Sequence, residues 1–247
     1  MKRQFFALLI VAAAMPLPLL ITGDHWWAFI LATGAIAAAL RLLLGQEWLD
    51  CAGLKLPPIH ALSAVVAFAL IALGSKMLLH RVYEAAGLRA TTPPLEDQIG
   101  FLFQAFNEEM FFRALLIGLL VQYLPSAPLI SLGAAFLFAA AHFLLYRFGA
   151  LHMTLSPMAL ATLFLAAVAM NNLYLAFRHV GFSWALHAGW NVVWLPATFY
   201  DAASNRQLYE PQIFDRVLGT PTVVAAALVS AILSFALLAR ERGRQTA

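Results

Sequence analysis

The chain has 247 residues, of which 63% are hydrophobic and 11% charged, and its formal net charge is +3. Soluble domains are about half apolar and about a quarter charged, so this composition excludes an ordinary soluble protein and predicts an integral membrane protein. No stretch combines clustered basic residues with interleaved aromatic ones, so no nucleic-acid partner is predicted, and the single cysteine excludes an intramolecular disulfide.

Apolar runs of membrane-spanning length recur along the whole chain. A bilayer core takes about 20 apolar residues of helix. By that measure the sequence predicts one membrane-embedded all-α domain over 1–247, a polytopic protein with about eight transmembrane helices. The predicted spans are 5–22, 26–44, 59–80, 98–122, 129–146, 158–178, 181–199 and 221–239.

The first apolar run follows two basic residues, as the core of a signal peptide does. Lys2 and Arg3 precede it, but the run is longer than a typical signal-peptide core, and "MPLPLLITGD" has no small-x-small cleavage site. We therefore expect residues 5–22 to be retained as the first membrane helix.

Basic residues in the connections predict the orientation, since cytoplasmic connections are rich in Lys and Arg. With the N-terminus inside, eight basic residues fall on inner segments and five on outer ones. This bias predicts both termini in the cytoplasm, and the compact, Ala/Leu/Arg-rich chain favours a bacterial cytoplasmic membrane. The inner residues are Lys2, Arg3, Arg41, Lys55, Arg178, Arg240, Arg242 and Arg244, and the outer ones are Arg81, Arg89, Arg147, Arg206 and Arg216.

Three charged residues interrupt the apolar run 98–122, in the stretch "FNEEMFFRALL" (106–116). A charged side chain near the bilayer centre costs about 2.5–3.5 kcal/mol on translocon-derived scales, so a site inside the helix bundle must require them. Glu109 and Arg113 are four residues apart on one helix face and are predicted to form an ion pair. That pair alone is equally compatible with a structural salt bridge. Glu108 points about 100° away, which leaves it as a candidate general base.

Two further spans carry polar residues of matching chemistry. His142 lies in "FLFAAAHF", and His187 and Asn191, four residues apart on one helix face, lie in "SWALHAGWNVVW". His and Asn side chains donate hydrogen bonds of the kind that stabilise an oxyanion, and Gly189 permits close approach of another helix. Each residue alone could instead bridge helices structurally. Their coincidence with the glutamates on three spans predicts a functional site in an intramembrane polar cavity.

Two asparagines late in the apolar run 158–178 leave their role open. Asn171 and Asn172 either line the same cavity or hydrogen-bond to neighbouring helices. Both interpretations fit an amide inside a helix bundle, because it must find its partners there.

The polar residues also match a known family. Glu108-Glu109-x-x-x-Arg113 resembles the EExxxR motif of the CPBP family, the CAAX-protease and bacteriocin-processing membrane proteins also called ABI. Phe138-x-x-x-His142 resembles its FxxxH motif, and "HAGWN" (187–191) resembles its HxxxN motif. The three motifs occur in the family's order on separate spans, and the matching core covers about 98–200.

The resemblance implies a fold and a set of residue roles. It implies the eight-span fold of Rce1-type CAAX proteases and an intramembrane endopeptidase of glutamic type. Glu108 and His142 would hold and activate the attacking water, and His187 and Asn191 would stabilise the oxyanion of the tetrahedral intermediate. The remaining motif residues would support the site: Glu109 and Arg113 by bracing it, and Phe138 by packing beside it.

A metal-dependent variant of this chemistry is the main alternative mechanism. Two histidines and a carboxylate suit zinc, which would take Glu108, His142 and His187 as ligands. No HExxH motif is present, and these candidate ligands are scattered over three helices. The sequence therefore favours a mechanism without metal or other cofactor.

The predicted function is hydrolysis of a peptide bond in a membrane-associated protein or peptide. The substrate classes are a C-terminal tail, a prenylated CAAX-like end, a bacteriocin leader and a sorting signal. One alternative is a proton-coupled transporter, since intramembrane Glu and His relay protons, but the repeated halves typical of transporters are not found. Another is a non-catalytic immunity or binding protein on the same fold, in which we would expect the glutamates or histidines to be lost.

Overall fold

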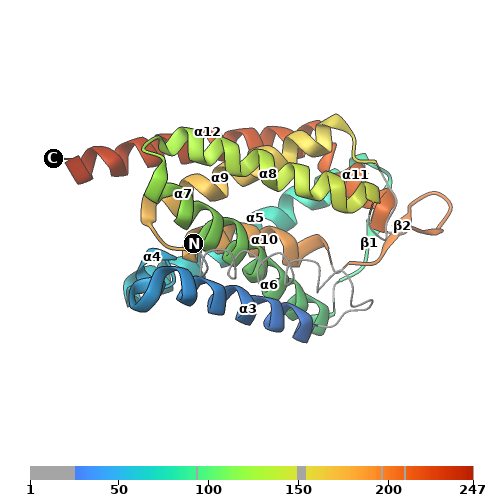
Figure 1. The fold of residues 1–247 in the computed structure, drawn as a ribbon. Helices are drawn as coiled ribbons and strands as arrows, with labels where there is room; N and C mark the ends of the chain where they lie inside the picture. Colours follow the sequence, from blue (N-terminus) through green and yellow to red (C-terminus); the bar gives the residue numbers. More distant parts are fainter. Residues whose placement is uncertain (1–25, 93, 149–153, 196, 209, 247) are drawn as a thin grey trace.

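The computed structural model describes residues 26–92, 94–148, 154–195, 197–208 and 210–246 (Figure 1). Helices make up 81% of the structure, which confirms the all-α class. The predicted first span, 5–22, lies outside the described residues, as do Lys2 and Arg3.

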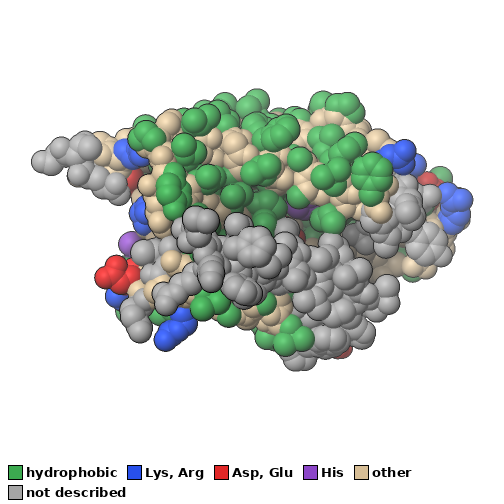
Figure 2. Space-filling view, viewed as in Figure 1, with side chains coloured by type: hydrophobic (Ala, Val, Ile, Leu, Met, Phe, Trp, Pro, Cys, Tyr) green, Lys and Arg blue, Asp and Glu red, His purple; other side chains and the backbone are tan. Residues whose placement is uncertain are grey.

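Four long helices have the length and composition of membrane spans. They are α5 (Pro58–Ala85), α8 (Ala127–Phe148), α9 (Pro157–Phe177) and α12 (Pro221–Thr246). The shortest, α9, has 21 residues and is therefore about 31 Å long, enough to cross a hydrocarbon core of about 30 Å. Figure 2 shows apolar side chains over the length of the visible helices, with Lys and Arg gathered toward the ends. The protein is thus a multi-pass membrane protein, and the total of eight spans stays a prediction.

The other predicted spans form helices with different limits. Run 26–44 is α3 (Trp26–Leu44). Run 98–122 is a continuous helical stretch of three parts, which are α6 (Leu95–Glu109), η2 (Met110–Ile117) and α7 (Gly118–Tyr123). The predicted span 181–199 was too long. It forms only α10 (Gly181–Trp194), whose 14 residues reach about 21 Å, because the chain after it turns into a β-strand.

A small antiparallel sheet closes one end of the helix bundle, at the right in Figure 1. Its strands are β1 (Leu88–Ala90), β2 (Phe199–Asp201) and β3 (Gln207–Leu208), in the order β1-β2-β3. Leu88 pairs with Asp201, so the sheet ties the end of α5 to the segment after α10. The sequence did not predict it, because strands of two or three residues are too short to show a period of two. The remaining short elements are η1 (Gly45–Glu47), α4 (Trp48–Cys51) and α11 (Glu210–Leu218).

Helix α9 is the centre of the bundle. Of its most apolar 18 residues 61% are buried, against 17% in α5 and 28% in α8 and in α12. The other three spans therefore present most of their apolar surface outward, where lipid would cover it, while α9 is enclosed by α8, α10 and α12.

Helix α10 packs closely against α5, as the glycine between His187 and Asn191 predicted. A Cβ atom on Gly189 would lie 2.9 Å from Cγ2 of Ile71 and 3.1 Å from the backbone oxygen of Phe68. Both atoms belong to α5, and neither is the end of a flexible side chain, so only glycine fits without a shift of one helix.

Replacing Gly189 by alanine is expected to destabilise the protein by about 1–3 kcal/mol, the usual cost of overpacking a tight contact. Thermal unfolding of the purified protein in detergent measures the effect. Gly133→Ala in α8 is the matched control, because a Cβ there meets nothing within 4 Å and alanine is the better helix former. Equal midpoints for the two variants would contradict the close packing of α10 on α5.

Candidate active site

A cavity of about 720 Å³ lies inside the helix bundle. Residues of α5, α6 (Leu95–Glu109), α8, α9, α10, α11 and α12 form its wall. Four residues singled out by the sequence motifs, Glu108, His142, His187 and Asn191, all line this cavity. These residues lie far apart in the chain, on α6, α8 and α10, but line the same cavity.

The two adjacent glutamates of α6 face different surroundings, as their 100° separation predicted. Glu109 has no exposed surface, and its Oε1 accepts a hydrogen bond from Nη1 of Arg113 at 2.9 Å, so the predicted contact between them is present. Glu108 instead lines the cavity, with 19% of its side chain exposed.

Arg113 lies in a π-helical segment that was not predicted from the sequence. Residues Met110–Ile117 form the π-helix η2, which begins directly after Glu109 and continues into α7 (Gly118–Tyr123). π-helical turns are rare and are found most often at functional sites. Here the segment carries Arg113, which is fully buried, to the side of α6 that faces α8 and α9.

His187 connects the two glutamates. Its Nδ1 lies 2.9 Å from Oε1 of Glu109, and its Nε2 lies 3.6 Å from Oε2 of Glu108. A carboxylate oxygen can only accept, so Nδ1 carries the hydrogen in the contact with Glu109. The buried glutamate therefore orients the imidazole so that Nε2 points at the carboxylate that lines the cavity.

His142 approaches Glu108 from α8. Its Nε2 lies 4.0 Å from Oε2 of Glu108, and its Nδ1 lies 3.0 Å from the backbone oxygen of Phe138. Because a carbonyl oxygen only accepts, Nδ1 carries the hydrogen, and Nε2 of the neutral ring is left as an acceptor facing the cavity. Glu108 also accepts a hydrogen bond through its Oε1 from Nε2 of Gln104, at 3.4 Å.

Phe138 packs between the buried arginine and the histidines, where the motif pattern placed it. Its ring centroid is 4.3 Å from that of His142 and 6.2 Å from that of His187, and the guanidinium of Arg113 lies 5.1 Å from its face. With 3% exposure, Phe138 separates the Arg113 charge from the cavity and fixes both rings.

The two asparagines of α9 bond to neighbouring helices and do not line the cavity. Asn171 accepts a hydrogen bond from Nε of Arg113 at 3.0 Å and donates one to the backbone oxygen of Ser131 at 2.8 Å. Asn172 donates to Oγ of Ser234 in α12 at 3.0 Å. The sequence shows two asparagines in an apolar helix, but only the packing of the helices determines that Asn171 and not Asn172 bonds to Arg113.

A comparison with known protein families gives a match to the part of the chain that carries the three motifs. A family model described as "Rce1-like: Type II CAAX prenyl endopeptidase Rce1-like" matches residues 98–193. That range runs from α6 to the end of α10 and includes every residue of the three motifs. Residues 98–193 are thus similar to the Rce1-like family. The predicted resemblance is thereby confirmed, and because the family is one of proteases, the match supports a peptidase in general terms. None of the curated proteins compared with the chain matches it.

Proposed function

We propose that the protein is an intramembrane endopeptidase of glutamic type that hydrolyses a peptide bond of a membrane-associated protein or peptide. The observation that carries this proposal is the convergence of the Glu108 carboxylate with the Nε2 atoms of His142 and His187, at 4.0 and 3.6 Å, on the cavity wall. The protease family of residues 98–193 supports it.

Glu108 and His142 activate the water in this proposal. Both present acceptor atoms to the cavity, so one water can donate a hydrogen bond to each and keep a lone pair for the carbonyl carbon of the substrate. As the water attacks, Glu108 takes its proton as general base. The protonated carboxyl then gives that proton to the leaving amide nitrogen, and the C–N bond breaks.

His187 and Asn191 stabilise the oxyanion. With its Nδ1 hydrogen directed at Glu109, His187 can donate from Nε2 only as an imidazolium. The carboxylates of Glu109 and Glu108 lie beside the two ring nitrogens of His187, at 2.9 and 3.6 Å. Asn191, one helical turn further along α10, adds an uncharged donor.

A zinc-dependent variant would use Glu108, His142 and His187 as ligands. The unprotonated Nε2 of His142 suits a metal ligand. In the part of the chain that the structure describes, no group of three or more His, Cys, Asp and Glu residues is spaced to hold a metal ion. The mechanism proposed here activates water with Glu108 and His142 and uses neither zinc nor another cofactor.

The substrate is proposed to be a C-terminal tail, a prenylated CAAX-like end, a bacteriocin leader or a sorting signal. Both termini are proposed to be cytoplasmic, in a bacterial cytoplasmic membrane. Arg178 and Lys55, both predicted on the inner side, lie at the same end of the bundle. The connection that carries each of them meets the other there, because the N–H of Val180 donates to the backbone oxygen of Gly53 at 2.9 Å.

His187→Ala and Asn191→Ala are each expected to lower kcat by about 100-fold or more, the usual loss of an oxyanion donor. A donor that acts mainly in the transition state changes kcat, whereas one that only binds substrate changes KM. Steady-state kinetics on a cleaved substrate separate the two. An increase in KM with unchanged kcat would contradict the oxyanion role.

Comparative terminal proteomics tests the proposed function as a whole. A strain lacking the protein is complemented either with the unaltered chain or with Glu108→Gln, and the protein termini of the two strains are compared. A membrane-associated protein trimmed only in the presence of the unaltered chain is the expected result and names the substrate. Identical sets of termini in the two strains would refute the peptidase proposal.

A further inference from the structure

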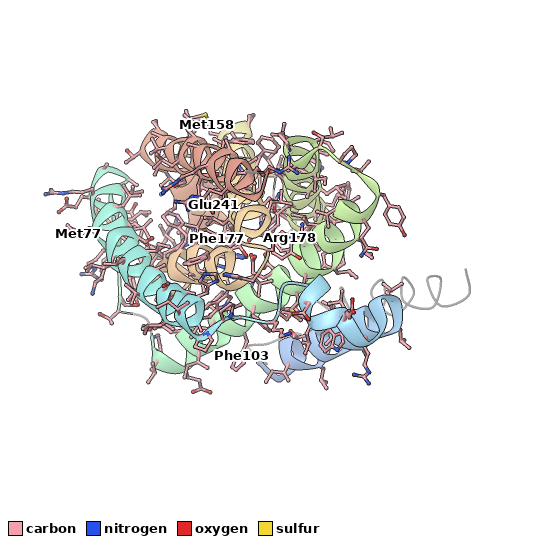
Figure 3. The ribbon with its side chains drawn as sticks, turned by 90° about the vertical axis from the view of Figure 1, so that its left-hand side faces the viewer. Met77, Phe103, Met158, Phe177, Arg178 and Glu241 are labelled. Carbon is pink, nitrogen blue, oxygen red and sulfur yellow. The ribbon has the colours of Figure 1, made fainter. Side chains whose placement is uncertain are left out.

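Two histidines from different segments meet at the end of the bundle opposite the β-sheet. Nε2 of His179, in the turn between α9 and α10, lies 3.1 Å from Nδ1 of His60, in the first turn of α5. Figure 3 views the molecule from this end and labels Phe177 and Arg178, which directly precede His179. Neither histidine is among the described residues that line the active-site cavity.

The hydrogen bonds around this pair determine where each ring carries its hydrogen. The backbone N–H of Gly181 donates to Nδ1 of His179 at 3.2 Å, so this nitrogen carries no hydrogen. The hydrogen of the neutral His179 ring is then on Nε2, which donates it to Nδ1 of His60. Both hydrogen bonds are present together only while the two rings are neutral.

A proton added to the pair breaks one of these two hydrogen bonds. On Nδ1 of His179 the proton faces the N–H of Gly181, and on Nδ1 of His60 it faces the Nε2 hydrogen of His179. In either case two donors oppose each other, because a charged imidazole has no acceptor nitrogen left. His179 is only 2% exposed, so water does not replace the lost partner without cost.

The surroundings of the pair are apolar and closely packed. The ring centroids of Phe177 and Phe182 lie 5.9 and 5.4 Å from that of His179, and each lies 6.3 Å from that of His60. A Cβ atom on Gly53 would lie 2.8 Å from Cα of His179. The turn therefore has no room to move toward the connection before α5 when the pair takes up a proton.

The charged groups near the pair are exposed, which leaves His60 as the titratable group that faces His179. Arg178 precedes His179 and is exposed, and Lys55 and Asp50 pair with each other at 3.2 Å, with 70% and 57% of their side chains exposed. Burial, and then the charge of His60, lower the pKa of His179 below its ordinary value of 6.5. The unfolded chain therefore takes up this proton more readily. Stability from the pair is present above pH 6.5 and is lost as the pH falls through the lower, folded-state pKa.

The pair connects the start of α5 to the turn from which α10 begins. Helix α10 packs on α5 and carries His187 and Asn191. We propose that His60 and His179 form a pH-sensitive switch, which holds this turn on α5 while both rings are neutral and releases it when the pair takes up a proton. Histidine is suited to such a switch because it changes charge near neutral pH. Acidification would thus loosen the helix that carries His187 and Asn191.

Thermal unfolding of the purified full chain in a neutral detergent, at about pH 7.5 and about pH 5.5, tests the switch on either side of the ordinary pKa of histidine. His60→Asn is the decisive variant. Its Oδ1 is bonded to Cγ, as Nδ1 of histidine is, so it can accept the hydrogen from His179 but does not titrate. The midpoint of the unaltered protein is expected to fall by about 2–10 °C more than that of this variant. Equal falls would overturn the proposal.

His179→Asn removes the contact between the two residues and keeps the turn. An asparagine side chain accepts a hydrogen bond from the N–H two residues later, as Nδ1 of His179 does from Gly181, but it is too short to reach His60. Its midpoint is expected to be lower by about 2–10 °C already at about pH 7.5, with a smaller further fall on acidification. An unchanged midpoint at that pH would contradict the switch, and if this variant does not fold, the comparison with His60→Asn decides.

The matched control removes the same titratable group from the same helix. His80 is exposed near the other end of α5, where its Nε2 lies 3.3 Å from Glu84. His80→Asn is expected to keep the pH-dependent fall of the unaltered protein. If it removes the fall as His60→Asn does, titration of histidines in general, and not this pair, causes the effect.

Hydrogen–deuterium exchange shows where the chain opens. The unaltered protein and His60→Asn are labelled at both pH values, with labelling times scaled for the pH dependence of chemical exchange. Faster exchange of the amides in 179–187 at the lower pH is expected in the unaltered protein and not in His60→Asn. An equal increase in all helices, or none in this segment, would refute a local release of the start of α10.

Discussion

Glu108→Gln is expected to lower cleavage by about 100- to 10,000-fold, the contribution of a positioned general base, while the protein accumulates to its usual level. Glutamine keeps the shape of the side chain but cannot take a proton from water. The substitution is expected to leave the fold intact because Glu108 lines a cavity and its hydrogen bond from Gln104 is long, at 3.4 Å. Cleavage is followed by mass spectrometry of the trimmed terminus, and abundance by immunoblotting of membranes.

A second glutamate on the same cavity wall supplies the control. Glu96, in the first turn of α6, also lines the cavity but is exposed and three helical turns away from Glu108. Glu96→Gln removes the same charge from the same wall and should leave cleavage near the level of the unaltered protein. Normal cleavage in Glu108→Gln would refute its role as base, and equal losses in both variants would show that overall cavity charge, not a specific base, matters.

The residues of the candidate site could be picked out from the sequence more sharply than the ends of the helices that carry them. A charged residue inside an apolar run is costly, so Glu108, Glu109 and Arg113 stood out without any knowledge of the fold. The motif spacing also predicted the contact between Glu109 and Arg113, which needs only the geometry of one helix. Side chains from α8 and α10 were expected at the same place, and the structure brings His142 and His187 there.

Features that depend on contacts between distant segments were not predictable. Asn171 and Asn172 are chemically identical neighbours, and only the packing of α9 against η2 and α12 gives one to Arg113 and the other to Ser234. The π-helix over 110–117 has no composition signature of its own. The early end of α10 follows from the pairing of β2 with β1, whose partner residues are more than 100 positions apart.

Glu109→Ala and Arg113→Ala are expected to lower the free energy of unfolding by about 3–5 kcal/mol each, the cost of leaving a buried charge without its partner. Neither side chain has any exposed surface, so water cannot replace the missing partner. Because typical stabilities are about 5–15 kcal/mol, both variants should accumulate poorly in membranes as well as cleave poorly. Chemical unfolding in detergent and membrane abundance measure this effect. If both variants accumulate and cleave normally, the bracing role is wrong.

Removing both charges together separates bracing from catalysis. Glu109→Gln combined with Arg113→Gln leaves neither buried charge unpaired, so most of the lost stability should return. Cleavage should stay low in this double variant, because Nδ1 of His187 then faces an amide and the imidazolium loses the carboxylate that stabilises it. Recovery of abundance without recovery of kcat is therefore the expected signature. Recovery of both would mean that Glu109 and Arg113 only hold helices together, and that His187 needs no carboxylate behind it to serve the oxyanion.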